Sequence, residues 1–235
     1  EKQVANREEI QPRAAGKTHR IAGFDELPLV AFTLLAQMAA GMAVCLLALP
    51  TIPRPWLLSP GALLGVGGLI SFLHLGKKRN AWRAVIHLKK SWLSREILMA
   101  GLFGLAWTFT VGLKGQQEAS LAHWVMALLG AGLVYSMVKV YRLRAAPAWN
   151  TWRTPASFFL SAAVLGCLGV SLAMPEPGLA AIAGIALAAE LDIALTAKAV
   201  QNSWAGRLRI VLLGVGMIGT LLMVMGVGLA VPVLG

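Results

Sequence analysis

Long apolar stretches separated by short polar segments dominate this sequence. A helix that crosses a membrane needs about 20 largely apolar residues, and seven stretches come close to this length or exceed it. They are Leu27–Leu49, Pro60–Gly76, Leu93–Leu113, Leu121–Val140, Ala156–Met174, Gly178–Val200 and Arg209–Leu234. Because a backbone inside lipid must satisfy its hydrogen bonds within the protein, the pattern predicts an all-α bundle of about seven transmembrane helices.

The polar segments divide the chain into two regions. Residues 1–26 are polar and mixed in charge, and no apolar core of a signal peptide is found among them. We therefore expect a polar N-terminal segment, 1–26, followed by a helix bundle, 27–235. Within the bundle, 81–92 is too polar to span a membrane. Its apolar side chains share one helical face, namely Trp82, Val85, Ile86 and Trp92. This spacing predicts an amphipathic helix lying in the membrane interface.

The basic residues predict how the bundle is oriented. Of the 21 Lys and Arg residues, 19 lie in the N-terminal segment or around the connections after the second, fourth and sixth stretches. Arg54 and Lys114 alone belong to the other side. Since cytoplasmic loops carry the excess of Lys and Arg, we predict a cytoplasmic N-terminus and a multi-pass protein of the bacterial inner membrane.

Composition supports this class and excludes others. The chain is 57% hydrophobic and 13% charged, whereas soluble domains are about 25% charged. The net charge of +11 does not indicate nucleic acid, because the basic residues lie between apolar stretches. It indicates anionic membrane lipids or an acidic partner subunit.

Cysteine and histidine are too few and too dispersed to predict a metal or haem site. Cys45 and Cys167 each lie inside an apolar stretch. They form neither a disulfide framework nor a cluster of thiolates, so we expect two small buried hydrophobic residues. A haem needs two axial ligands at one depth. His74 and His123 belong to opposite ends of their spans, about 30 Å apart, so we predict no haem and no metal.

A polar constellation is predicted where the second stretch ends and the third begins. His74 closes one and Glu96 opens the other, so both lie at one depth on the cytoplasmic side. The polar and glycine neighbours are Gly76, Lys77, Ser94 and Arg95. A quinone needs hydrogen bonds to its carbonyls and a titratable group for its protons, and these side chains suit that chemistry. Alternatively, His74 and Glu96 only end helices and pair with interfacial basic residues.

Two acidic residues lie inside the sixth stretch. An ionisable residue at membrane depth is a functional candidate, so Glu190 and Asp192 are candidates for a proton path. The alternative is an ion pair inside the bundle, for which the sequence offers Lys198 and either Arg142 or Arg144 as partners. A similar polar group on the fourth stretch consists of Tyr135, Ser136 and Lys139.

Several segments resemble the DMSO reductase anchor subunit family. The most specific are Ser71–Gly76 (SFLHLG), Ala81–Ala84 (AWRA) and Ser91–Ile97 (SWLSREI). Weaker matches are Glu26–Leu29 with Phe32, Thr33 and Gln37, then Val140–Arg142, Pro147–Thr151, Phe158–Phe159 and Leu208–Leu213. Together they cover nearly the whole chain after about residue 25.

The resemblance implies a haem-free membrane anchor. Such an anchor exchanges electrons between ubiquinone or menaquinone and a four-cluster iron–sulfur subunit, with a molybdopterin catalytic subunit beyond. It associates His74 and Glu96 with the quinone site. This chain departs from the family by having Lys78 and Asn80 where Pro and Arg are frequent, which leaves Arg83, or Arg79, for the arginine role. The family usually has eight spans rather than seven.

The predicted orientation selects among functions. Partners on the cytoplasmic face resemble the arrangement of a quinone-reducing sulfite dehydrogenase, and a DMSO reductase anchor that oxidises quinol is the alternative. A secondary transporter with Glu190 and Asp192 as its coupling site would have broken helices in two repeated halves, and the sequence shows no such repeat. A purely structural anchor with a basic docking face is the third alternative.

Overall fold

The described part of the chain forms seven α-helices. The computed structural model describes residues 27–49, 51–74, 87–112, 121–142, 149–172, 174, 176–197 and 204–225. The elements are α1 (Leu27–Cys45) with a 3-10 turn η1 (Leu46–Ala48), α2 (Arg54–His74), α4 (Trp92–Gly112), α5 (Leu121–Tyr141), α6 (Arg153–Ser171), α7 (Pro177–Thr196) and α9 (Trp204–Val224). Each helix falls on one predicted apolar stretch, and the described residues contain no β-strand. The predicted all-α class is confirmed.

The start of α2 differs from its prediction. The helix begins at Arg54, and Pro60, predicted as its first residue, lies inside it. Proline has no N–H to donate to the carbonyl four residues earlier, which here belongs to Trp56. The Ser59 hydroxyl donates to this Trp56 carbonyl oxygen at 2.7 Å. A neighbouring serine therefore satisfies the carbonyl, as membrane helices with proline require.

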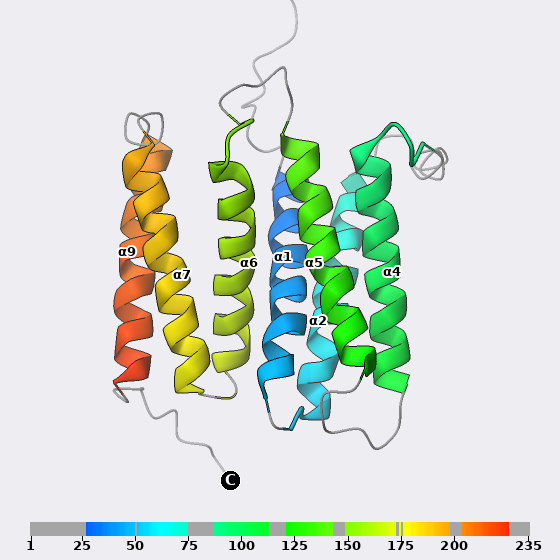
Figure 1. Cartoon of the computed structure of the whole chain (residues 1–235), viewed down its shortest axis with the longest axis horizontal. Helices are drawn as coiled ribbons and strands as arrows, with labels where there is room; N and C mark the ends of the chain where they lie inside the picture. The colour runs from blue at the N-terminus through cyan, green and yellow to red at the C-terminus, as the bar shows by residue number, and fades with distance from the viewer. Residues whose placement is uncertain are drawn as a thin grey trace, which may run out of the picture.

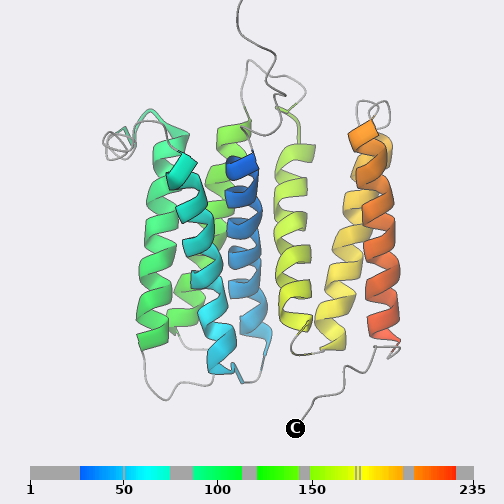
Figure 2. The same ribbon diagram turned by 180° about the vertical axis from the view of Figure 1, so that it is seen from behind.

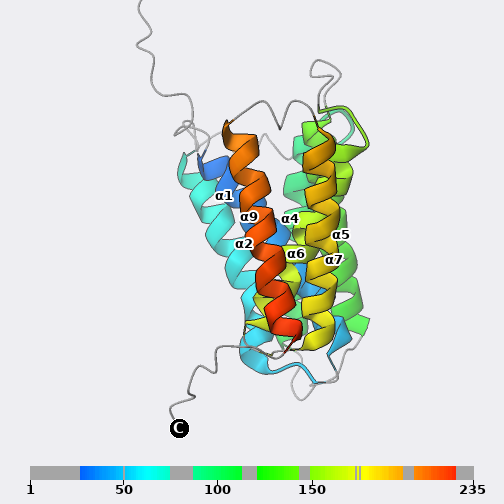
Figure 3. The same ribbon diagram turned by 90° about the vertical axis from the view of Figure 1, so that its left-hand side faces the viewer.

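Helix α1 lies in the middle of the bundle. It packs against α2, α5 and α6, while α4 packs on α5, and α7 lies between α6 and α9. In Figure 1 the helices run side by side from α9 at the left to α4 at the right, and Figure 2 shows the same order from behind. Figure 3, from the α9 side, shows all seven running along a common direction. This is the arrangement of a membrane bundle.

Small residues allow α1 to hold this central position. Its fully or almost fully buried side chains include Ala36, Ala39, Ala40 and Ala43. A methyl group added to Gly41 would lie 1.9 Å from the carbonyl oxygen of Ala162 in α6. The two backbones are therefore in direct contact, which only small residues permit.

The outer face of the bundle is apolar. On α9, Val211, Leu212, Val215 and Ile218 are each at least 60% exposed. By length and composition, five described helices are able to cross a membrane, at Leu27–Ala48, Arg54–Leu73, Leu121–Tyr141, Arg153–Ser171 and Gly178–Thr196. Helices α4 and α9 have 21 residues each and run beside these five. Exposed apolar side chains along such lengths are suited to contact with lipid tails.

Basic side chains gather at one end of the bundle, which we call the basic end. It is where α1, α4, α6 and α9 begin and where α2, α5 and α7 end, at the top of Figure 1. Of the nine Lys and Arg residues in the described ranges, eight belong to helix ends or turns there, and Arg54 belongs to the opposite end. The alternation of basic connections predicted from the sequence is present in the fold.

Reporter fusions test the predicted orientation. A reporter fused to the N-terminus is expected to behave as cytoplasmic, because α1 begins at the basic end, which holds eight of the nine described Lys and Arg residues. A reporter inserted between Lys114 and Ser120 is expected to behave as external. Alkaline phosphatase and fluorescent-protein activities of the two fusions measure this, and exchanged activities would contradict the predicted orientation.

Some predicted segments lie outside the described residues. These include the N-terminal segment, 1–26, and 81–86 of the predicted interfacial helix. Residues 87–90, predicted as part of that interfacial helix, form a turn. The N–H of Ser91, the next residue, donates to the His87 carbonyl oxygen at 2.9 Å. Trp92 already begins α4.

Candidate functional site

Glu96 is buried one turn inside the basic end of α4. Its side chain is 6% exposed, and Phe103 and Thr110 on the same helix are also buried. Their spacing of seven residues places all three on one face of α4, which points into the bundle. No described residue forms an ion pair with Glu96; the ion pair found among the described residues joins Arg209 and Glu190. The structure thus holds a carboxyl group away from solvent, where ionisation without a partner costs free energy.

The first turn of α4 is fixed by serine and arginine. The Ser91 hydroxyl accepts a hydrogen bond from the Ser94 N–H at 3.3 Å, which is the bond of an N-cap residue. Ser94 itself is buried. The Arg95 guanidinium donates to the carbonyl oxygens of Leu88 at 2.8 Å and Lys89 at 3.1 Å. Arg95 therefore holds the 87–90 turn against α4, and its described hydrogen bonds go to these carbonyl oxygens and not to Glu96.

Aromatic and basic side chains join α4 to α5 beside Glu96. The rings of Trp92 and Tyr135 meet edge to face, with centroids 6.1 Å apart. The Arg95 guanidinium lies 4.1 Å from the Trp92 ring, and the Lys139 ammonium lies 5.2 Å from the Tyr135 ring. These cation–π contacts fix the helix ends around Glu96. From sequence, Tyr135 and Lys139 were recognisable only as a separate polar group, because their contact with Trp92 depends on how α4 and α5 pack.

The register between α2 and α4 places the backbone of His74 at the depth of Ser94. A methyl group on Gly104 of α4 would lie 3.7 Å from Leu64 Cδ2 of α2. The Trp107 indole N–H also donates to the Leu57 carbonyl oxygen at 2.9 Å. Ten residues on from Leu64 is His74, and ten residues back from Gly104 is Ser94. Because the two helices are antiparallel, both steps lead about 15 Å toward the basic end, so the end of α2 and the start of α4 share one level.

The remaining residues predicted for this site lie outside the described residues. They are Gly76, Lys77 and Arg83. The structure therefore brings the end of α2 and Glu96 to one level, with Ser94 and Arg95 beside Glu96.

Comparison with known proteins identifies the family. Residues 21–201 match the family model of the DMSO reductase anchor subunit (DmsC). This match covers α1 to α7 and well over half of the chain. The chain belongs to this family. Helix α9 lies beyond the residues that match the family model. The comparison with solved structures found no match for this anchor subunit family member.

Three curated relatives of this anchor subunit family member are named as chains or subunits of a reductase or dehydrogenase. The matching anaerobic dimethyl sulfoxide reductase chain of Haemophilus influenzae is 35% identical over 171 residues, 66% of this chain and 60% of the relative. The protein of the same name from Escherichia coli is 30% identical over 174 residues, 65% of this chain and 60% of the relative. The matching sulfite dehydrogenase subunit of Allochromatium vinosum is 34% identical over 119 residues, 43% of this chain and 37% of the relative.

These similarities show how much of each relative the chain matches and that the protein belongs in a membrane. Its match spans 60% of the length of the two dimethyl sulfoxide reductase chains. The family and the apolar helices together show an integral membrane protein.

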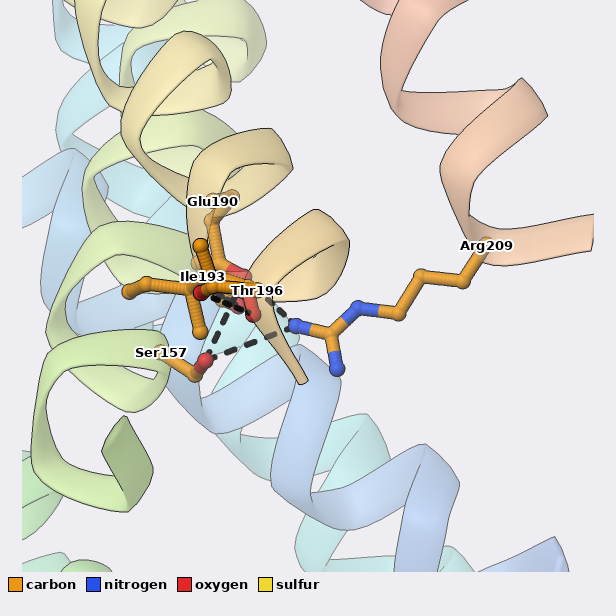
Figure 4. Close-up of polar contacts among 6 residues, drawn as sticks. Ser157, Glu190, Ile193, Thr196 and Arg209 are labelled. Atoms are coloured by element: carbon orange, nitrogen blue, oxygen red, sulfur yellow. Dashed lines mark hydrogen bonds and ion pairs between the residues drawn. The ribbon is translucent and has the colours of Figure 1, made fainter. Parts of the chain in front are cut away.

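A second buried carboxylate joins α6, α7 and α9. Glu190 of α7 is 2% exposed and forms an ion pair with Arg209 of α9 at 2.5 Å. Two hydroxyl groups of α6, from Ser157 and Ser161, donate to the same carboxylate at 3.3 Å each. Figure 4 shows the Arg209 side chain reaching across from α9 to Glu190 and Ser157. The predicted partners were Lys198 and either Arg142 or Arg144; the partner that the structure shows is Arg209.

Asp192 does not share this environment. Its side chain is exposed, and two residues along a helix turn by about 200°, so Asp192 points away from Glu190. Arg142, a predicted partner, instead donates from Nε to the Asn150 side-chain oxygen at 3.2 Å. A proton path through Glu190 and Asp192 stays a prediction.

The two cysteines are buried, as predicted, but they are not isolated from each other. Cys45 of α1 is 7% exposed and Cys167 of α6 is 2% exposed. Their Sγ atoms lie 3.2 Å apart. No sequence pattern indicates this contact, since 122 residues separate the two positions.

His74 and His123 lie at opposite ends of the bundle, as predicted. His74 is the last residue of α2 at the basic end, and His123 is in the first turn of α5 at the opposite end. No three His, Cys, Asp or Glu side chains among the described residues gather as metal ligands. The absence of haem and metal stays a prediction.

Proposed function

We propose that this protein anchors a redox complex in the bacterial inner membrane and exchanges electrons with the quinone pool. The quinone headgroup binds at the basic end, between the end of α2 and the start of α4. The observation that carries the proposal is the buried carboxyl of Glu96 at the level where α2 ends with His74. Membership of an anchor subunit family supports it.

The proposed site supplies hydrogen bonds and protons to the quinone. Reduction of a quinone takes up two electrons and two protons, and oxidation of a quinol releases them. In this proposal His74 donates a hydrogen bond to one quinone carbonyl, and Glu96 gives or accepts a proton. A carboxyl that pairs with no cation among the described residues suits this role, because a firmly paired carboxylate would keep its charge and exchange a proton less readily.

The proposed partners dock on the basic end. They are an iron–sulfur subunit with four clusters and, beyond it, a molybdopterin catalytic subunit. The cations of the described turn and helix ends, such as Lys89, Lys90 and Arg142, favour an acidic partner surface. A short distance to the nearest cluster also favours this end, because electron transfer slows steeply with distance.

The side of the membrane distinguishes two forms of this function. If the basic end is cytoplasmic, as its charge predicts, the partners are cytoplasmic and the chain acts like the membrane subunit of a sulfite dehydrogenase that reduces quinone. The alternative is an anchor that oxidises quinol for a dimethyl sulfoxide reductase, which the names of the more similar relatives favour.

Replacing His74 by alanine tests the proposed site. The variant is expected to bind a fluorescent quinone-analogue inhibitor at least about tenfold more weakly, because a lost hydrogen bond to a ligand is worth about 1.4 kcal/mol or more when its partner is left unsatisfied. Fluorescence titration of membranes containing the assembled complex measures the affinity.

The matched control is His87→Ala, since His87 is an exposed histidine at the same end. It is expected to leave the affinity unchanged. Equal affinities in wild type and His74→Ala would move the quinone elsewhere. Loss of complex assembly in His74→Ala would instead support a purely structural anchor.

A further inference from the structure

The contact between Cys45 and Cys167 has no role in the proposed quinone site. Cys45 is the last residue of α1, and Cys167 lies one turn before the end of α6. Both positions are at the end of the bundle opposite the basic end. Their Sγ atoms are 3.2 Å apart as thiols, and a disulfide bond is about 2.05 Å long. A small rotation of the two side chains would bring the sulfurs into bonding distance.

The backbones of α1 and α6 are close enough for a disulfide at this place. A methyl group on Gly166, the residue before Cys167, would lie 2.2 Å from the Gly41 carbonyl carbon. Gly41 lies one turn before Cys45 on α1. Disulfides require Cα atoms about 4.4–6.8 Å apart, and few pairs of transmembrane helices approach this closely. The backbone contact lies one turn from Cys45 and one residue from Cys167, and the Sγ atoms already lie 3.2 Å apart, which favours such a separation.

The predicted orientation puts the pair near an oxidising compartment. The end opposite the basic end is external if Lys and Arg mark the cytoplasmic side. Disulfides form and persist in the bacterial periplasm and are rare in the cytosol. Both cysteines would be near that face while the helices insert.

We propose that Cys45 and Cys167 form a disulfide that clamps the outer ends of α1 and α6 together. The oxidant is a disulfide, on a thiol oxidase or a small molecule, of the external compartment. The Cys45 thiolate, having released its proton, attacks one sulfur of that disulfide and expels the other as a thiolate. The Cys167 thiolate then attacks the Cys45 sulfur and expels the second. Two protein thiols are oxidised, and one external disulfide is reduced to two thiols.

Burial determines when this bond forms and how long it lasts. With 7% and 2% exposure in the packed bundle, neither sulfur is open to a protein oxidant. The exchange therefore takes place before α6 has packed on α1. Once the bundle has closed, the same burial shields the disulfide from soluble reductants, because exchange requires access to a sulfur.

Counting free thiols tests the proposal on the full chain. Cells are quenched in acid, and the protein is denatured and treated with a 5 kDa maleimide–polyethylene glycol, before or after reduction. The wild-type chain is expected to gain no polymer before reduction and two polymers after it. The Cys45→Ser and Cys167→Ser variants are the matched controls, and each is expected to gain one polymer in both samples.

Dithiothreitol added at two different times tests when the bond forms and whether burial protects it. Dithiothreitol added during synthesis is expected to leave both thiols free, whereas dithiothreitol added to folded protein in membranes is expected to leave the bond intact. Two polymers on unreduced wild-type protein would overturn the disulfide, and a reductant-sensitive dimer would overturn the bond within one chain. Neither result would affect the quinone proposal, because the pair lies at the opposite end of the bundle.

Discussion

Replacing Glu96 by glutamine is expected to reduce quinone-linked turnover of the assembled complex about 100-fold, since a positioned general acid or base contributes about 10²–10⁴. The amide keeps the size of the side chain and its ability to form hydrogen bonds, but it cannot exchange a proton. Glu96 is buried and has no ionic partner among the described residues, so the substitution breaks no ion pair that the structure describes. Assembly should therefore be preserved.

Two activities of the same membranes separate proton exchange from assembly. One is turnover of the substrate with quinone or quinol, and the other is turnover with an artificial dye that reacts directly with the catalytic subunits. Glu96→Gln is expected to lower the first and to leave the second at the wild-type level.

Glu190→Gln is the matched control for this experiment. Glu190 is another buried carboxylate, with 2% exposure, but it lies on α7 in a network with Arg209. The control is expected to retain quinone-linked turnover. Normal turnover in Glu96→Gln together with a loss in Glu190→Gln would relocate the proton exchange to α7.

Replacing Gly41 by alanine is expected to separate α1 from α6 and to destabilise the whole bundle. The added methyl group would lie 1.9 Å from the Ala162 carbonyl oxygen and 3.0 Å from the Gly166 Cα atom. Both are backbone atoms, which cannot move away without shifting a helix. Overpacking of this kind costs about 1–3 kcal/mol and sometimes more. Since α1 contacts α2 and α5 as well as α6, the shift would spread to the other contacts of α1.

A lipid-facing glycine provides the comparison for Gly41. At Gly65 of α2, an added methyl group would meet no atom within 4 Å. Alanine is favoured over glycine in a helix by about 1 kcal/mol, so Gly65→Ala is expected to be neutral or stabilising. Thermal unfolding of the purified proteins in mild detergent measures both changes. A wild-type melting temperature for Gly41→Ala would show that α1 and α6 are not in backbone contact.

The sequence predicted the helices better than their ends. The apolar stretches and the basic segments between them specified seven helices in the right places, because bilayer thickness and backbone hydrogen bonding leave few alternatives. The starts of α2 and α9 were wrong by several residues. In α2 the helix extends past Pro60 because Ser59 satisfies the Trp56 carbonyl. In α9 it begins at Trp204, five residues before Arg209, because the first turn of a helix at the basic end can include a residue such as Arg207 that an apolar pattern excludes.

The sequence was enough to predict the membrane level of the candidate site, but not the contacts that its side chains make. That His74 and Glu96 share one level follows from antiparallel spans, whose lengths and order the sequence contains. The direction taken by Arg95, toward the Leu88 and Lys89 carbonyls, does not follow from sequence. A flexible side chain binds whichever groups lie nearest, and the turn at 87–90 supplies them.

The amino-acid pattern was thus enough to predict the class, the seven described helices, which end of them is basic and the depth of Glu96 and Glu190. Each of these depends on position along a single helix and on the bilayer. The packing of the helices was needed to show that Arg209 is the partner of Glu190 and that Cys45 meets Cys167 across 122 residues. Such contacts depend on which faces of which helices pack together. That choice is made by many small residues at once, such as Gly41 against Ala162, and no local pattern records it.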